Sequence, residues 1–176
     1  MALDIITSVS GVFRRDYEVP SAELPSQTSG FLNPDASDAL EQGEWLIPNA
    51  SGQYIRPVQL AGSAFASASV GDEAASGDTD GVRLLLAKCV FSVRGDYPAQ
   101  ALGKVTLIQS SDWEGSTDMF NGTPSIGDQL GLTKNSDGRM VLDTVTASND
   151  LVVAICTQAT SGGKIRFQAV QPYFIA

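Results

Sequence analysis

Histidine is absent from the 176 residues of this chain. Without it, a Ser-His or Cys-His nucleophile cannot be built, and proton transfer near neutral pH would depend on another side chain with a shifted pKa. We therefore predict a protein that is not an enzyme and carries no cofactor. The least implausible enzyme is a paired-carboxylate glycosidase using Asp112, Glu114 and Asp118. These acids fall in a polar stretch, 110–118, whose composition predicts an exposed loop.

Long hydrophobic runs are also missing. No stretch approaches the roughly 18 to 20 apolar residues that a membrane-spanning helix needs. The first residues, Met1-Ala2-Leu3-Asp4, lack the basic region and apolar run of a secretory signal. We expect no membrane association and a product that stays in the cytosol where it is made.

The chain has no basic stripe that could neutralise phosphates. Its formal net charge is -9, and the acidic excess is confined to the first half: residues 1–81 carry 12 acids and 3 bases, whereas residues 82–176 carry 8 of each. This distribution argues against binding to nucleic acid. An acidic first half would also be repelled by packed DNA, which favours an outward-facing position in any particle that encloses DNA.

Cysteine is scarce. Cys89 and Cys156 each sit inside an apolar run, and in a reducing compartment we interpret both as buried thiols that act as small hydrophobic residues. A disulfide between them stays open, because both runs are predicted strands. Two thiols without histidine make a poor zinc site, and Asp78-Thr79-Asp80-Gly81 lacks the ligands of a calcium loop, so we predict no metal site.

The chain is rich in short segments with β character. Residues 44–47 and 53–58 predict a hairpin, and the later part of 82–93 favours a strand. Further strands are expected at 104–109, 129–133, 139–145, 151–157 and 164–170, with turn signals every 8 to 14 residues. This spacing predicts an all-β fold, a small antiparallel β-barrel or β-sandwich. The only helix candidates are short, at 35–41 and 97–102.

The first 38 residues differ from the rest. They contain three prolines and no sustained period, yet they include many large apolar side chains. We predict an extended N-terminal arm over 1–38, ordered against the chain's own body or against a neighbouring subunit, and a body over 39–176. A small, acidic, exposed loop is expected at about 62–81.

Three phrases of the sequence, taken in order, resemble a known family. They are Gly43–Ile47 with Gly52–Arg56, then Arg94–Thr106, and finally Gly127–Leu130 followed by Gly162–Phe167. In this order they resemble the capsid decoration, or cement, proteins of tailed bacteriophages, over roughly residues 43–170. The insertion at 62–81 departs from the family pattern.

The resemblance implies a β-barrel or β-tulip body on the outer surface of a phage head. It implies binding to the major capsid protein, self-association as a trimer or dimer, and stabilisation of contacts between capsid subunits. It carries no catalytic residues. An alternative use of the same scaffold is a tail, fibre or receptor-recognition module. For protein contacts we select the arm residues Phe13, Tyr17, Phe31 and Leu32, each of which could instead dock onto the chain's own body.

Overall fold

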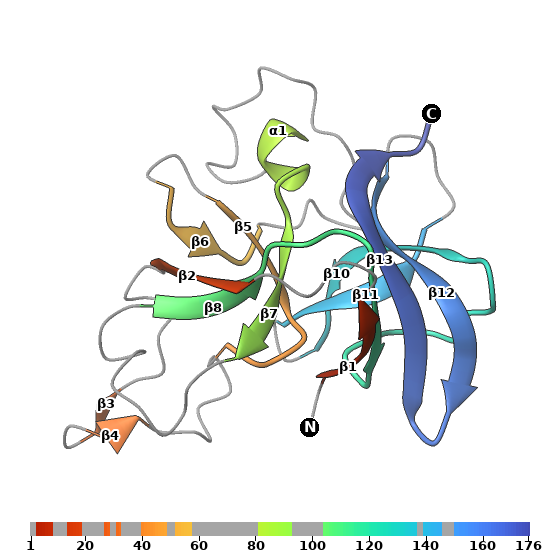
Figure 1. Cartoon of the computed structure of the whole chain (residues 1–176), viewed down its shortest axis with the longest axis horizontal. Helices are drawn as coiled ribbons and strands as arrows, with labels where there is room; N and C mark the ends of the chain where they lie inside the picture. Colours follow the sequence, from red (N-terminus) through yellow and green to blue (C-terminus); the bar gives the residue numbers. More distant parts are fainter. Residues whose placement is uncertain are drawn as a thin grey trace.

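The computed structural model describes residues 3–8, 14–18, 27–28, 31–32, 40–48, 52–57, 81–92, 104–136, 139–145 and 150–176. Within these ranges almost all regular structure is antiparallel β (Figure 1). The strands are β1 (Leu3–Ser8), β2 (Arg14–Glu18), β3 (Gln27–Thr28), β4 (Phe31–Leu32), β5 (Trp45–Pro48), β6 (Tyr54–Ile55), β7 (Lys88–Ser92), β8 (Lys104–Ile108), β9 (Trp113–Thr117), β10 (Gln129–Lys134), β11 (Met140–Thr144), β12 (Leu151–Ser161) and β13 (Lys164–Phe174). A single helical turn, α1 (Gly81–Leu84), precedes β7.

The strands form two main sheets. One has six strands in the order β1-β9-β13-β12-β10-β11, and the other has five in the order β2-β8-β7-β5-β6. The long β12–β13 hairpin dominates one side of the molecule, and β2, β8, β7 and β5 lie on the other side (Figure 1). The predicted all-β antiparallel class is confirmed, and the described strands build an open, sandwich-like arrangement instead of a closed barrel.

The main hydrophobic core collects side chains from both sheets. It joins Trp45 and Cys89 of the five-stranded sheet to Trp113 and Phe167 of the six-stranded sheet. The Trp113 and Phe167 rings meet edge to face, with centroids 5.2 Å apart and planes at 76°. Aromatic pairs favour this geometry. Burial of this shared core holds the two sheets together.

A second cluster covers the other face of the five-stranded sheet. Its buried members are Leu40, Leu46, Tyr54, Val90, Val105 and Leu107. In β7, Cys89 belongs to the main core and its neighbour Val90 to this second cluster, as expected for side chains that alternate across a strand. The central strands of this sheet are therefore buried on both faces, which explains why their sequences are apolar runs.

Most strand predictions are confirmed. The hairpin at 44–47 and 53–58 is β5–β6, with Ile47 opposite Ile55. The segments at 104–109, 129–133, 139–145, 151–157 and 164–170 are β8, β10, β11, β12 and β13, and the run at 82–93 ends in β7. Helix candidate 97–102 lies outside the described residues, as do 35–39 of the other candidate. Leu40 and Glu41 are not helical.

The predicted loop at 110–118 is wrong. Residues Trp113–Thr117 form β9, which lies between β1 and β13 in the six-stranded sheet. Its inward positions are Trp113, Gly115 and Thr117, and all three are buried. Glycine is used at the centre because a Cβ there would lie 2.6 Å from Trp113 Cζ3 and 2.8 Å from Phe167 Cζ. Glycine and threonine on the buried face hide the apolar alternation that a strand usually displays.

The segment predicted as an arm contributes strands to the body's own sheets. β1 pairs with β9, and β2 pairs with β8. β3 and β4 form a separate two-stranded sheet. Residues 62–80 of the predicted acidic loop lie outside the described residues, and Gly81 begins α1.

Candidate functional site

The predicted contact residues occupy different places along the N-terminal segment. Phe13 lies outside the described residues. Tyr17 lies in β2 at the register position opposite Val105 of β8. Phe31 and Leu32 form β4, opposite Thr28 and Gln27 of β3. The structure thus places Tyr17 on a different sheet from Phe31 and Leu32.

Strand β1 forms one edge of the six-stranded sheet. Its Leu3 is 2 % exposed and belongs to the main core, which anchors the strand. The register shifts between Ile5 and Thr7, and Ile6 at this irregularity is 37 % exposed. A bulge re-aims a side chain at a sheet edge. Edge strand β1 therefore presents a large apolar side chain to solvent.

An ion pair connects β1 to β13 across β9. Lys164 Nζ lies 2.7 Å from Asp4 Oδ2, and both side chains are substantially exposed. The hydrogen bond from Lys164 and its positive charge lower the pKa of Asp4. The same hydrogen bond raises the pKa of Lys164. An ion pair that is exposed to solvent contributes little to the stability of the fold. The ion pair places two charged groups near Ile6, which follows Asp4 by two positions on β1.

Strand β2 forms an edge of the five-stranded sheet. All five of its residues pair with β8 in unbroken register, from Arg14 opposite Ile108 to Glu18 opposite Lys104. No other described strand pairs with it. Arg15 is exposed. Among the described strands, β2 is therefore the outermost on its side of the five-stranded sheet.

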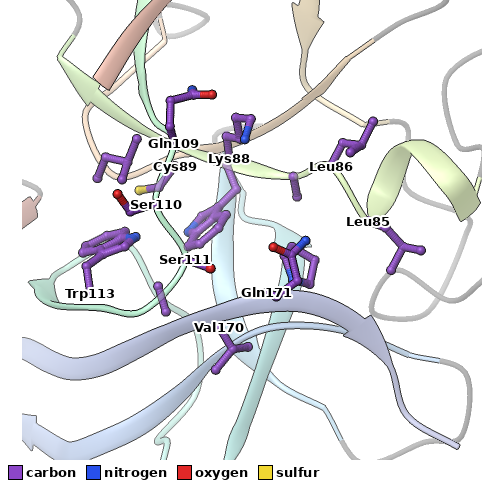
Figure 2. A pocket seen from close by; sticks show the side chains of 15 residues that line it. Leu85, Leu86, Lys88, Cys89, Gln109, Ser110, Ser111, Trp113, Val170 and Gln171 are labelled. Atoms are coloured by element: carbon purple, nitrogen blue, oxygen red, sulfur yellow. The ribbon is translucent and has the colours of Figure 1, made fainter. Parts of the chain in front are cut away.

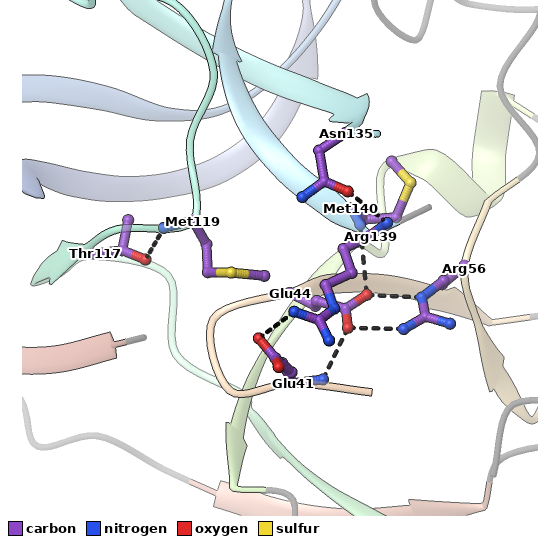
Figure 3. A network of polar contacts seen from close by, with 8 residues as sticks. All are labelled: Glu41, Glu44, Arg56, Thr117, Met119, Asn135, Arg139 and Met140. Carbon is purple, nitrogen blue, oxygen red and sulfur yellow. Dashed lines mark hydrogen bonds and ion pairs between the residues drawn. The ribbon is translucent and has the colours of Figure 1, made fainter. Parts of the chain in front are cut away.

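A buried carboxylate connects the two sheets (Figure 3). The Glu44 side chain is 0 % exposed, and its oxygens lie 2.7 Å from Arg56 Nε and 2.8 Å from Arg56 Nη2. The backbone N–H groups of Glu41 and Met140 also donate to it, at 2.7 and 3.4 Å. Met140 begins β11 of the opposite sheet. This bidentate arrangement matches a planar guanidinium to a carboxylate.

The same network links two neighbouring segments of the sequence, 43–47 and 52–56. Glu44 directly precedes β5, and Arg56 directly follows β6, so the β5–β6 hairpin brings them together. The sequence predicted the hairpin but not the ion pair between Glu44 and Arg56. The available signal was Glu44 itself, a charged residue in front of the apolar run Trp45-Leu46-Ile47. Charged residues in such positions are rarely buried unless they are paired.

The carboxylates considered for catalysis lie on the solvent side of β9 and next to it. Asp112 Oδ1 accepts a hydrogen bond from Gln168 Nε2 at 2.8 Å. Glu114 Oε1 accepts one from Thr157 Oγ1 at 3.3 Å. Asp118 is exposed and follows Glu114 by four positions, about 13 Å along an extended chain. The Gln168 amide and the Thr157 hydroxyl are neutral partners, as is common on a polar sheet face.

A small cavity lies where the start of β7, the β8–β9 connection and β13 meet (Figure 2). Its volume is about 50 Å³, and Trp45, Cys89 and Ser111 are among the residues that line it. The Trp45 indole N–H is buried and has no hydrogen-bond partner. A polar cavity of this size has room for a few water molecules. No motif in the sequence predicted this cavity.

Both cysteines are buried free thiols, as predicted, and the alternative of a disulfide between them does not hold. Burial raises the pKa of Cys89 well above its ordinary range, and it also raises the pKa of Cys156. Among the residues placed by the structure, no three potential ligands gather in a metal-binding group. In that same part of the chain, no helix has both the length and the apolar character needed to cross a membrane.

These features define a two-sheet antiparallel β protein in which β1 and β2 lie at the ends of the strand order of the two main sheets. No family model, curated protein or solved structure matches the chain.

Proposed function

We propose that this chain is a non-enzymatic structural protein of a tailed-phage virion. It binds the outer surface of the capsid and stabilises contacts between major capsid protein subunits. The proposal combines the ordered sequence phrases with one structural observation that carries it: a compact β body presents Ile6 on edge strand β1. Exposed apolar side chains beside polar ones are typical of protein contact surfaces.

The contact with the capsid centres on β1 in this proposal. Ile6 supplies apolar area, and Asp4 and Lys164 supply a polar rim beside it. Because Leu3 is packed in the main core, β1 is held in place before it meets a partner. A preformed contact loses less conformational entropy on binding. The arm residues Phe13, Tyr17, Phe31 and Leu32 extend the predicted contact surface to a neighbouring subunit.

Stabilisation follows from mass action. A protein that binds only the assembled shell adds about 2.7 kcal/mol per site when its free concentration is about 100 times its dissociation constant. Self-association multiplies the attachment points and raises their effective concentration. The acidic excess of residues 1–81 supports a position on the outside of the head, away from packaged DNA. It is made in the host cytoplasm and assembles onto the virion.

The proposal is tested with heads of the encoding phage prepared without this protein. Adding the purified chain should give saturable binding and raise the temperature at which the heads rupture. Ile6→Asp should weaken that binding, because a charge replaces the apolar contact. The matched control is Ile126→Asp, since Ile126 is 72 % exposed and its neighbour Gly127 bonds to β12, which β9 and β13 separate from β1. If the folded wild-type chain does not bind the heads, the proposal is wrong.

The alternative is a tail, fibre or receptor-recognition module. One observation favours it: residues Thr157 and Ala159–Gly163 at the end of the β12–β13 hairpin are exposed, and the two strands project as a long hairpin (Figure 1). Exposed tips on rigid scaffolds are common recognition elements. The copy number in the virion separates the two functions, because cement proteins occur in hundreds of copies and fibres in few.

A further inference from the structure

The cavity beside β7 contains a buried hydrogen-bond donor that the described fold does not use. Trp45 is 3 % exposed and lines the cavity, and its indole N–H has no hydrogen-bond partner in the part of the chain that the structure describes. A buried N–H without an acceptor costs free energy, because it has lost its contact with water and gained nothing in exchange. A molecule in the cavity that offers an acceptor atom removes this cost.

The lining of the cavity has a polar and an apolar side. Figure 2 shows Ser110 and Ser111 on one side of the cavity and Leu85 and Leu86 on the other. A water molecule needs about two to four polar partners, so water against the apolar side is poorly bonded. A ligand that combines an acceptor with a hydrocarbon part replaces such water favourably. Further apolar side chains in the lining are Ile108, Ala169, Val170 and Pro172.

The charges of the lining favour a neutral ligand. Among the described residues that line the cavity, none is acidic and Lys88 is the one base. In the pairing of β5 with β7, Trp45 lies opposite Cys89, and Leu46 lies opposite Lys88. Cys89 belongs to the main core and Leu46 to the second cluster, so the Lys88 side chain leaves β7 on the face away from Trp45. A charged ligand beside Trp45 would therefore be buried without a partner of opposite charge, which is costly.

The size of the cavity limits the ligand to a few atoms. The cavity volume is about 50 Å³. A water-sized group needs about 10–15 Å³, so about three to five such groups fit. A short ketone or amide has this number of non-hydrogen atoms. Leu86, which is 49 % exposed, and Gln171, which is also exposed, belong to the lining, so the cavity reaches the surface and a small ligand can enter from solvent.

We propose that this cavity is a binding site for a small neutral carbonyl compound, such as a short-chain ketone or amide. The carbonyl oxygen accepts a hydrogen bond from the Trp45 indole N–H, and its second lone pair can accept one from the Ser111 hydroxyl. The hydrocarbon part of the ligand lies against the apolar side of the lining. This site goes beyond the proposed function and does not depend on capsid binding, so the isolated chain is sufficient to test it.

The experiment follows the indole N–H signals of the isotope-labelled chain by NMR while butanone is added. The chain has two tryptophans, Trp45 and Trp113, and triple-resonance experiments assign their two signals. The Trp45 signal should shift along a saturable curve with a dissociation constant on the order of 1 mM, as expected for a ligand of so few atoms. Propanoate has nearly the same shape as butanone but carries a negative charge. It should bind at least roughly tenfold more weakly.

A matched pair of variants tests the position of the site. Ser111→Val removes the hydroxyl on the polar side of the cavity, so it should weaken butanone binding at least roughly tenfold. Ser161→Val, at an exposed position at the end of β12, should bind butanone like wild type. The dispersion of the NMR signals shows whether each variant is folded.

The wild-type titration decides the proposal even if Ser111→Val does not fold. A Trp45 signal that only drifts linearly up to about 50 mM butanone would mean that the cavity takes up water alone, and the proposal would be overturned. Equal binding of butanone by folded Ser111→Val and Ser161→Val would overturn it as well.

Discussion

Replacing Arg56 with methionine tests the buried Glu44 network. Methionine keeps much of the length and apolar surface of arginine but removes its two hydrogen bonds to the Glu44 carboxylate, at 2.7 and 2.8 Å. The Glu44 side chain is 0 % exposed, so water cannot replace the lost donors without opening the structure. Among the described residues, the N–H groups of Glu41 and Met140 would remain as donors to Glu44.

The expected loss is large for a single substitution. Removing one partner of a buried ion pair costs about 3–5 kcal/mol. For a chain of this length, that corresponds to a fall in Tm of roughly 6 to 20 °C. Urea unfolding followed by tryptophan fluorescence measures the change, because Trp45 is adjacent to Glu44 and is buried in the main core.

Arg139→Met is the matched control. Arg139 Nη1 lies 2.7 Å from Glu41 Oε2, but the two side chains are 18 % and 40 % exposed. Such a pair contributes about 0–1 kcal/mol. The double variant Arg56→Met with Glu44→Gln should recover part of the loss of Arg56→Met, because no unpaired charge is left buried. Equal destabilisation by Arg56→Met and Arg139→Met would refute the reasoning.

Two further predictions concern backbone packing and the thiols. Gly131→Ala should destabilise the fold by about 2 kcal/mol or more, because the new Cβ would lie 2.4 Å from the backbone oxygen of Leu151, which cannot move aside. Gly163→Asn, in open space at a φ of 78°, should change the urea midpoint little, since asparagine tolerates that conformation. Both cysteines should react with a thiol reagent only when the chain unfolds; fast reaction of the native protein would contradict their burial. Their pKa values are raised in the folded state, so the unfolded state releases thiol protons first. Stability should therefore be unaffected by the thiols below about pH 8.5 and fall as the pH rises further, by up to about 1.4 kcal/mol per pH unit for each thiol.

The sequence predicted strands best where burial leaves a simple pattern. β13 alternates apolar and polar residues over Ile165, Phe167 and Ala169, and β12 begins with an unbroken apolar run. Both patterns follow from how many faces of the strand are buried. Strand β9 was not predicted, because the buried face of this strand carries Gly115 and Thr117 beside a single large apolar residue, Trp113. Its pattern becomes visible only when Phe167 is known to fill the space above Gly115.

The candidate site was harder to predict for a different physical reason. An edge strand is defined by which strands lie beside it, and local composition does not encode that neighbourhood. Leu3 and Ile6 look alike in sequence, yet one packs in the core and the other faces solvent. Similarly, Glu44 and Arg56 are 12 positions apart, and their pairing depends on the β5–β6 hairpin that brings them together. Long-range contacts of this kind need the fold.

The most direct test of the proposed function is the number of copies of this chain in purified virions. Quantitative mass spectrometry of particles, calibrated against the major capsid protein, measures the ratio of the two. Our account predicts hundreds of copies per head, in a fixed small-integer ratio to capsid subunits, and release of the chain under conditions that leave the tail attached. A count of a few copies that stay with detached tails, or complete absence from the particle, would contradict it.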